Sequence, residues 1–344
     1  MEENKQNVEL ILLDKCTFQS LKDEELKIIS KYKLLVPDIF LIENLKRTET
    51  INKLSKLENT YWIEHWSILA KNDLLGQSVK ITQEDLRKIT DDPVEVKKQV
   101  KLAKKTAKEY DELPQKLIEQ SQLDLSPKDS KNRVMDSVRK QTREYLPDNK
   151  ITDEEISRIV ANTWRKTKNI LTVPHSDWKT ISQSVINDLD NKPIRKEHRH
   201  LKESERAYIC NAVWLGFACL YFQTTESEKS QIFNRWNEES HQCLKYFAPY
   251  AYYFLALEFT ILWHIRKSKG NHKREILRDL GYLYYAHYTN VTFHTCDRQL
   301  KDTIEKIPFL NHIREEMVYF YNDEEQRPGE LNKSDWLNRL KSTN

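Results

Sequence analysis

Two acidic residues, one near each end of this sequence, directly follow short apolar runs. Asp14 ends the stretch 9–14, and Asp297 comes just after the β-prone run 291–295. An apolar run this short, bounded by polar residues, predicts a strand buried on both faces of a parallel sheet. Open parallel sheets bind their ligands just beyond the carboxyl ends of the strands. The two carboxylates are therefore candidates for ligand binding, although an Asp after a strand also commonly caps the helix that follows.

A third acidic residue occurs in a comparable position. Residues 32–36 form another strand-like run, and Pro37 closes it because proline cannot donate a hydrogen bond to a β-ladder. Asp38 can cap a helix from Ile39 onward, so Glu43 would lie in the first turns of that helix. Glu43 lies off the most apolar stripe, which allows its side chain to face a cleft.

The order of these motifs resembles that of the PIN-domain nucleases. In that family a buried first strand ends in Asp, and a second strand leads to a helix that carries Glu. A later helix carries Asp, and the next strand ends in a Thr-x-Asp signature. The resemblance covers roughly the first 60 and the last 100 residues. The matching residues are Asp14, Glu43, Asp279 within Arg278-Asp279-Leu280-Gly281, and Asp297 within Thr295-Cys296-Asp297-Arg298. The sequence departs from the family at Cys16, where a small hydroxyl or amide residue is usual, and Thr17 follows it.

The resemblance implies a metal-dependent nuclease site. Carboxylates gathered at strand ends repel one another and lose hydration unless a cation joins them. Oxygen-rich clusters suit Mg²⁺ or Mn²⁺, and such ions activate water and stabilise the leaving oxygen of a phosphodiester. Asp14 and Asp297 would bind the main ion, and Glu43 and Asp279 would bind a second ion or its waters. Thr17 and Thr295 would support these ligands.

Composition and resemblance together predict an α/β protein. Charged residues are 32% of the 344 and hydrophobic residues 38%, which is typical of a helix-rich globular chain. We expect a three-layer α/β/α PIN-like core, whose parallel sheet forms from both chain ends, with a mainly α-helical insertion. Residues 1–60 and 206–323 would be the two halves of the core, 61–205 the insertion and 324–344 a C-terminal tail. Within the second half, residues 304–321 are predicted to be one helix.

Composition also argues against several other classes of protein. Only 5 residues are Gly, and neither a Walker-type nor a dinucleotide-binding fingerprint occurs. The 5 cysteines form no Cys-x-x-Cys pair, which indicates reduced thiols in the cytoplasm, and the first residues do not read as a signal peptide. The apolar stretch 246–263 approaches the about 20 residues of a membrane span, but helices buried in a globular core explain it better. We therefore expect a cytoplasmic protein without a membrane partner.

Two clusters of basic residues are candidates for contact with a phosphate backbone. The formal net charge is only +3, so nucleic-acid affinity would have to come from such local patches. Acidic residues are interspersed in both clusters, which an ordinary solvated helix face explains equally well. From the resemblance we expect a nucleic-acid partner, RNA rather than DNA, and the sequence leaves open a homo-oligomer or a regulatory protein partner. The basic candidates are Lys97, Lys101, Lys104, Lys105, Arg195 and Arg199.

Two alternatives stay open beside the metal-dependent endonuclease. Arg195 and His200 have the Arg-x-x-x-x-His spacing, which resembles the active-site motif of the helical, metal-independent HEPN ribonucleases. Lys196, however, stands where those enzymes favour Asn, Asp or His. The other alternative is an inactive PIN-like scaffold or interaction protein. For the nuclease itself, the family resemblance implies a toxin-like or defence role.

Overall fold

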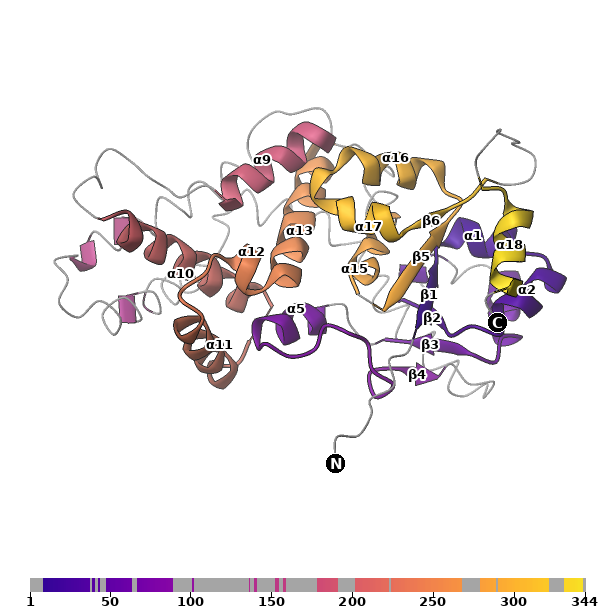
Figure 1. Cartoon of the computed structure of the whole chain (residues 1–344), viewed down its shortest axis with the longest axis horizontal. Helices are drawn as coiled ribbons and strands as arrows, with labels where there is room; N and C mark the ends of the chain where they lie inside the picture. The colour runs from indigo at the N-terminus through magenta and orange to yellow at the C-terminus, as the bar shows by residue number, and fades with distance from the viewer. Residues whose placement is uncertain are drawn as a thin grey trace. The chain divides into compact units, whose positions relative to one another are not determined.

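The computed structural model divides into two compact units, which are described separately. Unit 1 comprises Met1–Trp66, Lys80–Leu113 and Lys269–Asn344, and unit 2 comprises Ser67–Val79 and Pro114–Ser268 (Figure 1). The structure describes residues 9–37, 39–40, 43, 48–63, 67–88, 101, 136, 139–140, 152–154, 157–158, 178–190, 202–222, 224–267, 279–288, 290–321 and 331–342.

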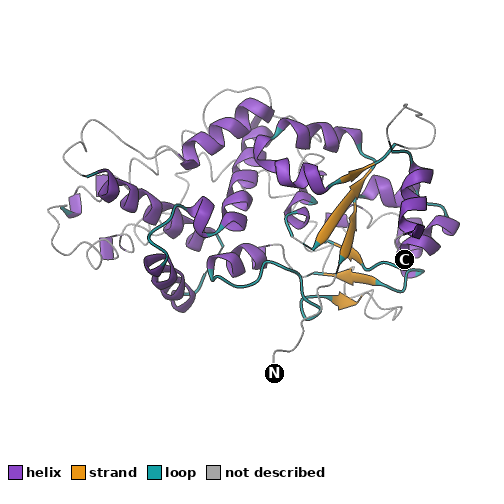
Figure 2. Ribbon diagram, in the orientation of Figure 1, coloured by secondary structure: helices purple, strands orange, loops and turns teal. Residues whose placement is uncertain are grey.

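Unit 1 contains a sheet, whose strands are orange in Figure 2. These strands come from both ends of the chain. The strand order is β4-β3-β2-β1-β5-β6; five strands are parallel, and β4 pairs antiparallel with β3. The prediction of an α/β protein with a parallel sheet built from both chain ends is confirmed. The bounds are β1 Leu10–Leu13, β2 Leu34–Val36, β3 Thr60–Trp62, β4 Arg87–Lys88, β5 Val291–Thr295 and β6 Val318–Tyr319.

Strand β1 lies between β2 and β5 in the middle of this sheet. All four of its residues are apolar and buried, as expected of a strand covered on both faces. α15 and α17 contact β5, and α18 packs against α2. The helices of unit 1 with printed bounds are α1 Lys15–Ser20, α2 Asp23–Ile29, α4 Thr48–Ser55, α15 Leu283–Ala286, α16 Arg298–Lys306, the short 3₁₀ helix η2 Pro308–Leu310, α17 Asn311–Glu316 and α18 Lys333–Ser342.

The prediction of one helix over residues 304–321 is wrong. Helix α16 ends at Lys306, Ile307 adopts an extended conformation, and Pro308 starts the 3₁₀ helix. Proline suits the first position of a helix because the missing N–H is not needed there. After α17 the chain is extended again at Met317 and enters β6. Two further strands, β3 and β4, occur where the sequence predicted the border and interior of a helical insertion.

Unit 2 is helical in its described residues. Arg235 links three segments, because its guanidinium donates hydrogen bonds to the carbonyl oxygens of Asp73, Leu74 and Phe247. No helix in the described part of the chain combines the length and apolarity that crossing a bilayer requires. The domain boundaries predicted from the sequence placed residues 206–323 in the core, whereas unit 2 includes the residues up to Ser268. Its helices with printed bounds are α5 Ser67–Leu74, α9 Trp178–Asp190, α10 Glu203–Tyr221, α11 Glu226–Glu238, α12 Leu244–Phe247 and α13 Pro249–Lys267.

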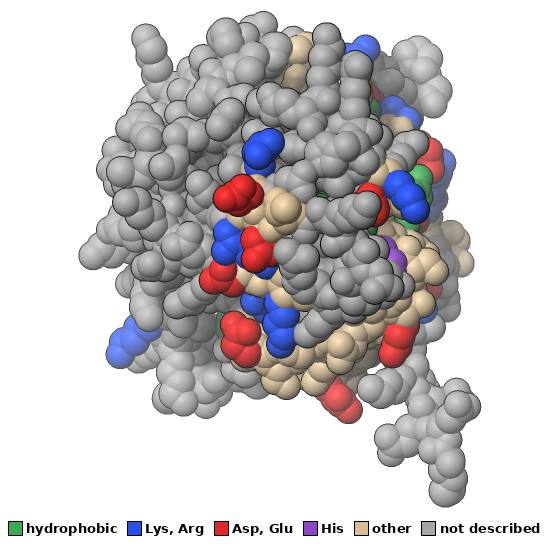
Figure 3. Space-filling view, turned by 90° about the vertical axis from the view of Figure 1, so that its left-hand side faces the viewer, with side chains coloured by type: hydrophobic (Ala, Val, Ile, Leu, Met, Phe, Trp, Pro, Cys, Tyr) green, Lys and Arg blue, Asp and Glu red, His purple; other side chains and the backbone are tan. Residues whose placement is uncertain are grey.

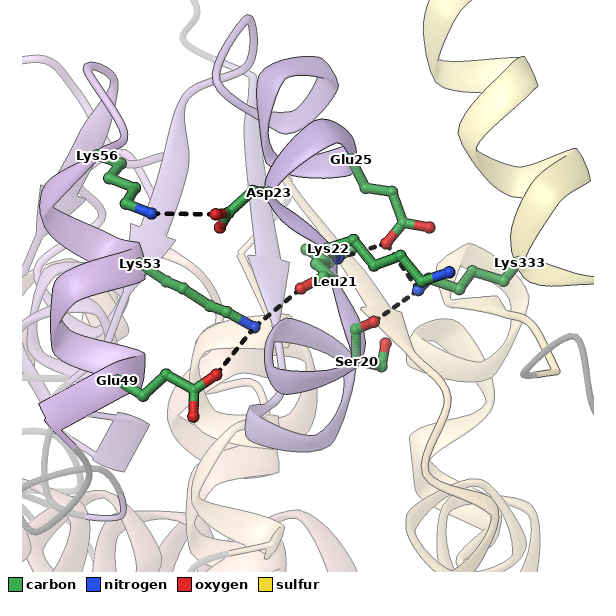
Figure 4. A network of polar contacts seen from close by, with 9 residues as sticks. All are labelled: Ser20, Leu21, Lys22, Asp23, Glu25, Glu49, Lys53, Lys56 and Lys333. Atoms are coloured by element: carbon green, nitrogen blue, oxygen red, sulfur yellow. Dashed lines mark hydrogen bonds and ion pairs between the residues drawn. The ribbon is translucent and has the colours of Figure 1, made fainter.

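A buried lysine connects the last helix, α18, to the segment that follows β1 (Figure 4). Lys333 is 6% exposed, and its Nζ donates to the carbonyl oxygen of Ser20 at 2.6 Å. The same Nζ lies 2.7 Å from Glu25 Oε2, which also accepts the backbone N–H of Lys22. The ion pair is therefore largely desolvated, since its side chains are 7% and 18% exposed, and loss of one partner from such a pair is costly.

Replacing Lys333 with Ala should lower the free energy of unfolding by about 2–3 kcal/mol, because the Glu25 carboxylate loses its cation in a largely buried position. The matched control is Lys56→Ala, since Lys56 pairs with Asp23 at 3.2 Å but both side chains are more than half exposed. That exposed pair should contribute less than about 0.5 kcal/mol. Urea unfolding of the two variants gives the comparison, and equal losses would contradict the anchoring role of Lys333.

Candidate metal centre

Asp14 lies at the junction of β1 and α1 and is 3% exposed. Its Oδ1 accepts the backbone N–H of Thr17 at 3.0 Å, so Asp14 caps α1. Burial raises the pKa of Asp14 to about 7, and the negative charge of Asp297 adds to this, although hydrogen bonds from Thr17 and Thr295 act in the opposite direction. The two interpretations of Asp14 are therefore compatible: the carboxylate caps a helix and also lies at the carboxyl edge of the sheet.

Asp297 occupies the equivalent position after the neighbouring strand. Its Oδ1 accepts the backbone N–H of Leu300 at 3.0 Å and so caps α16, while its own N–H donates to Thr295 Oγ1 at 2.9 Å. Strands β1 and β5 are adjacent and parallel, with Leu13 opposite His294. Because the carboxyl ends of parallel neighbours meet at one edge, the two Asp side chains approach each other from opposite ends of the sequence.

Both threonines predicted to support the ligands are fully buried at this edge. Thr17 Oγ1 accepts the backbone N–H of Cys296 at 2.8 Å, which ties α1 to the turn after β5. Thr295 hydrogen-bonds the side chain of Asp14 and accepts the N–H of Asp297. The hydroxyl groups thus hold the backbone around both carboxylates, as expected for groups behind a ligand.

Asp14, Cys16 and Asp297 each offer one ligand atom, and these atoms lie within 4.8 Å of one another. Ligand atoms on opposite sides of one Mg²⁺ are about 4 Å apart, so small side-chain shifts would bring this group onto one ion. Cys16 Sγ lies 3.9 Å from Asp297 Oδ2. Lost hydration, together with the charges of Asp14 and Asp297, raises the pKa of the Cys16 thiol to about 12. At pH 7 the two carboxylates are therefore the effective donors, because metals bind the thiolate rather than the thiol.

Asp279 and Glu43 do not belong to this group of three among the described residues. Asp279 is helical, as are residues 280 and 281, and burial is the largest cause of a pKa raised to about 7. The negative charges of Asp297, Glu43 and Asp14 contribute to this increase, which indicates that all four carboxylates share one electrostatic environment. The predicted four thus lie in the same region, with two of them close enough together to share one ion.

Two residues that the sequence did not single out contact Glu43. Tyr282 is buried, and its hydroxyl donates to Glu43 Oε2 at 2.6 Å. Lys15 Nζ lies 3.6 Å from Glu43 Oε1 and also lowers the pKa of Asp279. The sequence offered a signal for each: Lys15 directly follows Asp14, and Tyr282 follows Asp279 by three residues, the spacing of neighbours on a helix face.

Gly281 allows the segment that carries Asp279 to approach Ile39 closely. A Cβ added at Gly281 would lie 3.0 Å from Ile39 Cγ1, closer than side chains normally pack. Gly281→Ala should therefore lower the free energy of unfolding by about 1–3 kcal/mol. Because Ile39→Ala removes Cγ1, the nearest opposing atom, and Cδ1, the double variant should lose less stability than the sum of the two single variants. Urea unfolding in a double-mutant cycle measures this coupling, and additive losses would contradict a direct contact.

The residues predicted to bind nucleic acid are largely outside the described residues. Lys101 is helical and exposed. On the face drawn in Figure 3, the described Lys and Arg side chains are intermixed with Asp and Glu. The remaining candidates, Lys97, Lys104, Lys105, Arg195 and Arg199, lie outside the described residues, as does His200 of the alternative ribonuclease motif.

No protein-family model matches this chain, and no curated protein or solved structure matches it either. The description of the site therefore rests on the residues of this chain and their geometry.

Proposed function

We propose that this chain is a metal-dependent endonuclease with a three-layer α/β/α PIN-like core, and that it hydrolyses phosphodiester bonds, most readily in RNA. One observation carries the proposal: Asp14 and Asp297, from opposite ends of the sequence, follow adjacent parallel strands and offer ligand atoms within 4.8 Å of each other. Glu43 and Asp279 add two more carboxylates to the same electrostatic environment. This arrangement matches the motif order of the PIN-domain nucleases.

The chemistry of the donors fits Mg²⁺ or Mn²⁺. Burial and mutual repulsion raise the pKa of both Asp14 and Asp279 to about 7, so the ionised forms are unfavourable as long as no cation joins them. A divalent ion removes this penalty, and hard ions of this kind prefer carboxylate oxygens. Asp14 and Asp297 would hold the main ion, and Glu43 and Asp279 would hold a second ion or metal-bound waters.

A bound ion would supply Lewis-acid stabilisation and an activated water for an in-line displacement. The chain supplies the orientation. The hydroxyls of Thr17 and Thr295 hydrogen-bond the Asp14 carboxylate and accept the backbone N–H groups of Cys296 and Asp297. The Tyr282 hydroxyl donates to Glu43. Lys15 contributes a positive charge that offsets part of the repulsion among the acidic groups. No protein nucleophile is required in this mechanism.

The preference for RNA, a toxin-like or defence role and a cytoplasmic location come from the resemblance and the composition. They are extensions of the proposal rather than consequences of the geometry. A homo-oligomer or a regulatory protein partner is compatible with the same site.

The direct test is cleavage of end-labelled single-stranded RNA and DNA by the full chain in Mn²⁺, Mg²⁺ or EDTA. We expect endonucleolytic cleavage of RNA with either ion, slower cleavage of DNA, and no cleavage in EDTA. Cleavage that persists in EDTA would instead favour the metal-independent motif of Arg195 and His200. Absence of cleavage under every condition, with folding verified by circular dichroism, would favour an inactive scaffold.

A further inference from the structure

Unit 2 contains a cavity that the carboxylate site does not use. It has a volume of about 470 Å³, within the range of about 300–1,000 Å³ that small-molecule sites occupy. Its walls come from α9, α10, the turn before α12, α12 itself and α13, all within unit 2 (Figure 1). Neither the sequence motifs nor the proposed hydrolysis accounts for it.

Aromatic side chains line this cavity at different depths. Trp214 and Tyr252 are 5% and 2% exposed and form part of its wall. Tyr246 also lines it but is 72% exposed, and it is the one large hydrophobic side chain found exposed in the described part of the chain. An exposed tyrosine beside a cavity offers a flat face on which a planar ligand can stack.

The charges that line the cavity are already matched with each other. Asp190 Oδ1 accepts the hydroxyl of Tyr252 at 2.6 Å, and Asp190 Oδ2 lies 3.6 Å from Lys245 Nζ. A cationic ligand would compete with Lys245, and an anionic ligand would be repelled by Asp190. The wall therefore favours a neutral ligand. Asn211 and Gln242 line the cavity and carry amide groups; Asn211 Nδ2 already donates to His241 O, which leaves its second N–H and its Oδ1 for a ligand.

The turn that carries Gln242 has an unusual backbone. Ser240 and His241 have φ values of 61° and 58°, and they are the non-glycine residues with positive φ among those described. Hydrogen bonds fix this turn: His241 N–H donates to Trp236 O, Asn211 Nδ2 donates to His241 O, and Trp236 Nε1 donates to Gln242 O at 2.7 Å. Strained backbone that its surroundings hold in place is frequent where a protein clamps a ligand.

We propose that this cavity binds a nucleobase, through stacking on Tyr246 and hydrogen bonds from Gln242 and Asn211 to the edge of the ring. A nucleobase combines the properties that the wall selects: it is flat, neutral and rich in edge donors and acceptors. The base belongs either to a free nucleoside or nucleotide or to a single strand, since both present the same ring. This proposal does not depend on the nuclease site in unit 1.

The test is isothermal titration of the full chain with adenosine, guanosine, cytidine and uridine, and with a short single-stranded RNA. We expect binding that Tyr246→Ala and Tyr246→Leu each weaken by about tenfold, while Tyr246→Phe keeps it, because stacking needs the ring and not the hydroxyl. The high exposure of Tyr246 makes these variants safe for the fold. Binding of free nucleosides would identify the ligand as a free nucleoside or nucleotide. Binding of RNA alone, weakened in the same way by the Tyr246 variants, would identify it as a base within a strand.

Two results would overturn the proposal: no binding by any of these probes, or binding that Tyr246→Ala leaves unchanged. Asp14→Asn is the control that separates the two sites. Nucleoside affinity should be the same in this variant, because Asp14 belongs to unit 1 and does not line the cavity. A chain that cleaves nothing but binds nucleosides would refute the proposed function and leave this inference intact.

Discussion

Replacing Asp14 with Asn should reduce Mn²⁺-dependent cleavage of RNA at least about 100-fold, because loss of groups that only support a metal ligand already costs about 10–100-fold. The amide retains one oxygen but carries no charge, so it cannot offset the charge of a divalent ion. The substitution also removes the most buried of these carboxylates, since Asp14 is 3% exposed. Initial cleavage rates at saturating Mn²⁺ give the measurement.

Unfolding cannot explain such a loss. The raised pKa of Asp14, about 7, means that the folded chain resists ionising this group, and Asn is a neutral side chain of nearly the same shape. An Asn at an N-cap also accepts the backbone N–H that Asp14 accepts now. Without metal, the variant should therefore be at least as stable as the wild type above pH 7.

Asp297→Asn should cause a similar loss of activity, since Asp297 caps α16 in the same way and shares the ligand group with Asp14. Asp302→Asn is the matched control, because Asp302 lies in the same helix but outside the site. Its cleavage rate should stay within about twofold of the wild type, as expected for a substitution away from the chemistry. The proposed site would be refuted if Asp14→Asn and Asp297→Asn both cleaved as fast as this control.

The strands that carry the two capping carboxylates could be predicted because their own residues determine them. Residues 10–13 are apolar without interruption, and a run of that kind has few alternatives to a strand buried on both faces. The hypothesis of a shared carboxylate site also constrains the order of the strands, because Asp14 and Asp297 meet at one edge when β1 and β5 are neighbours. The structure has these two strands adjacent. Local pattern and site geometry are therefore consistent with each other at this part of the fold.

The segment 304–321 could not be predicted in the same way. Phe309, Ile313, Met317 and Phe320 have helical spacing, yet they come from a 3₁₀ helix, a short α-helix and the extended chain around β6. Each of these conformations can bury the same apolar residues, so the periodicity of the sequence alone does not distinguish them. The two-residue strand β6 and the three-residue strand β3 lack the continuous apolar run that made β2 predictable.

Lys15 and Tyr282 lie near predicted ligands in the sequence, but their contacts with Glu43 could not be predicted from it. Both residues are adjacent in the chain to a predicted ligand or one helical turn from it, but their partner is Glu43, on another element. These contacts join segments far apart in the sequence, as does the close approach of Gly281 to Ile39, and such tertiary contacts have no local signature. The charge compensation inside the site is therefore a property of the folded chain.

The stability of the metal-free protein should depend on the charge of Asp14. In the folded chain its pKa is raised from 3.8 to about 7, so the folded state retains a proton that the unfolded state releases. This stabilisation is complete below about pH 4 and is lost as the pH rises to about 7, a change of about 4 kcal/mol at most. Asp279, whose pKa is also raised to about 7, acts in the same direction.

Buried histidines change the stability with pH in the opposite direction, so their contribution must be separated from that of Asp14. Burial lowers the pKa of His294 to about 4, and its Nδ1 accepts the Trp336 Nε1–H at 2.8 Å. The His294 imidazole binds a proton more readily in the unfolded chain than in the folded chain, so the contribution of His294 to stability grows as the pH rises from about 4 to 6.5. The informative quantity is therefore the difference in unfolding free energy between wild type and Asp14→Asn, in which the histidine contributions cancel.

Urea unfolding in EDTA at pH 5, 6, 7 and 8 should show the wild type losing stability relative to Asp14→Asn as the pH rises. Adding Mn²⁺ should reverse this trend, because the ion binds the ionised carboxylates of the folded chain and stabilises it most above pH 7. The variant should gain little from Mn²⁺ at any pH. If Mn²⁺ stabilised both proteins equally, the ion would bind elsewhere and Asp14 would be only a buried helix cap. A stabilisation specific to Asp14 would link the lost activity directly to the lost ion, independently of which nucleic acid the enzyme cleaves.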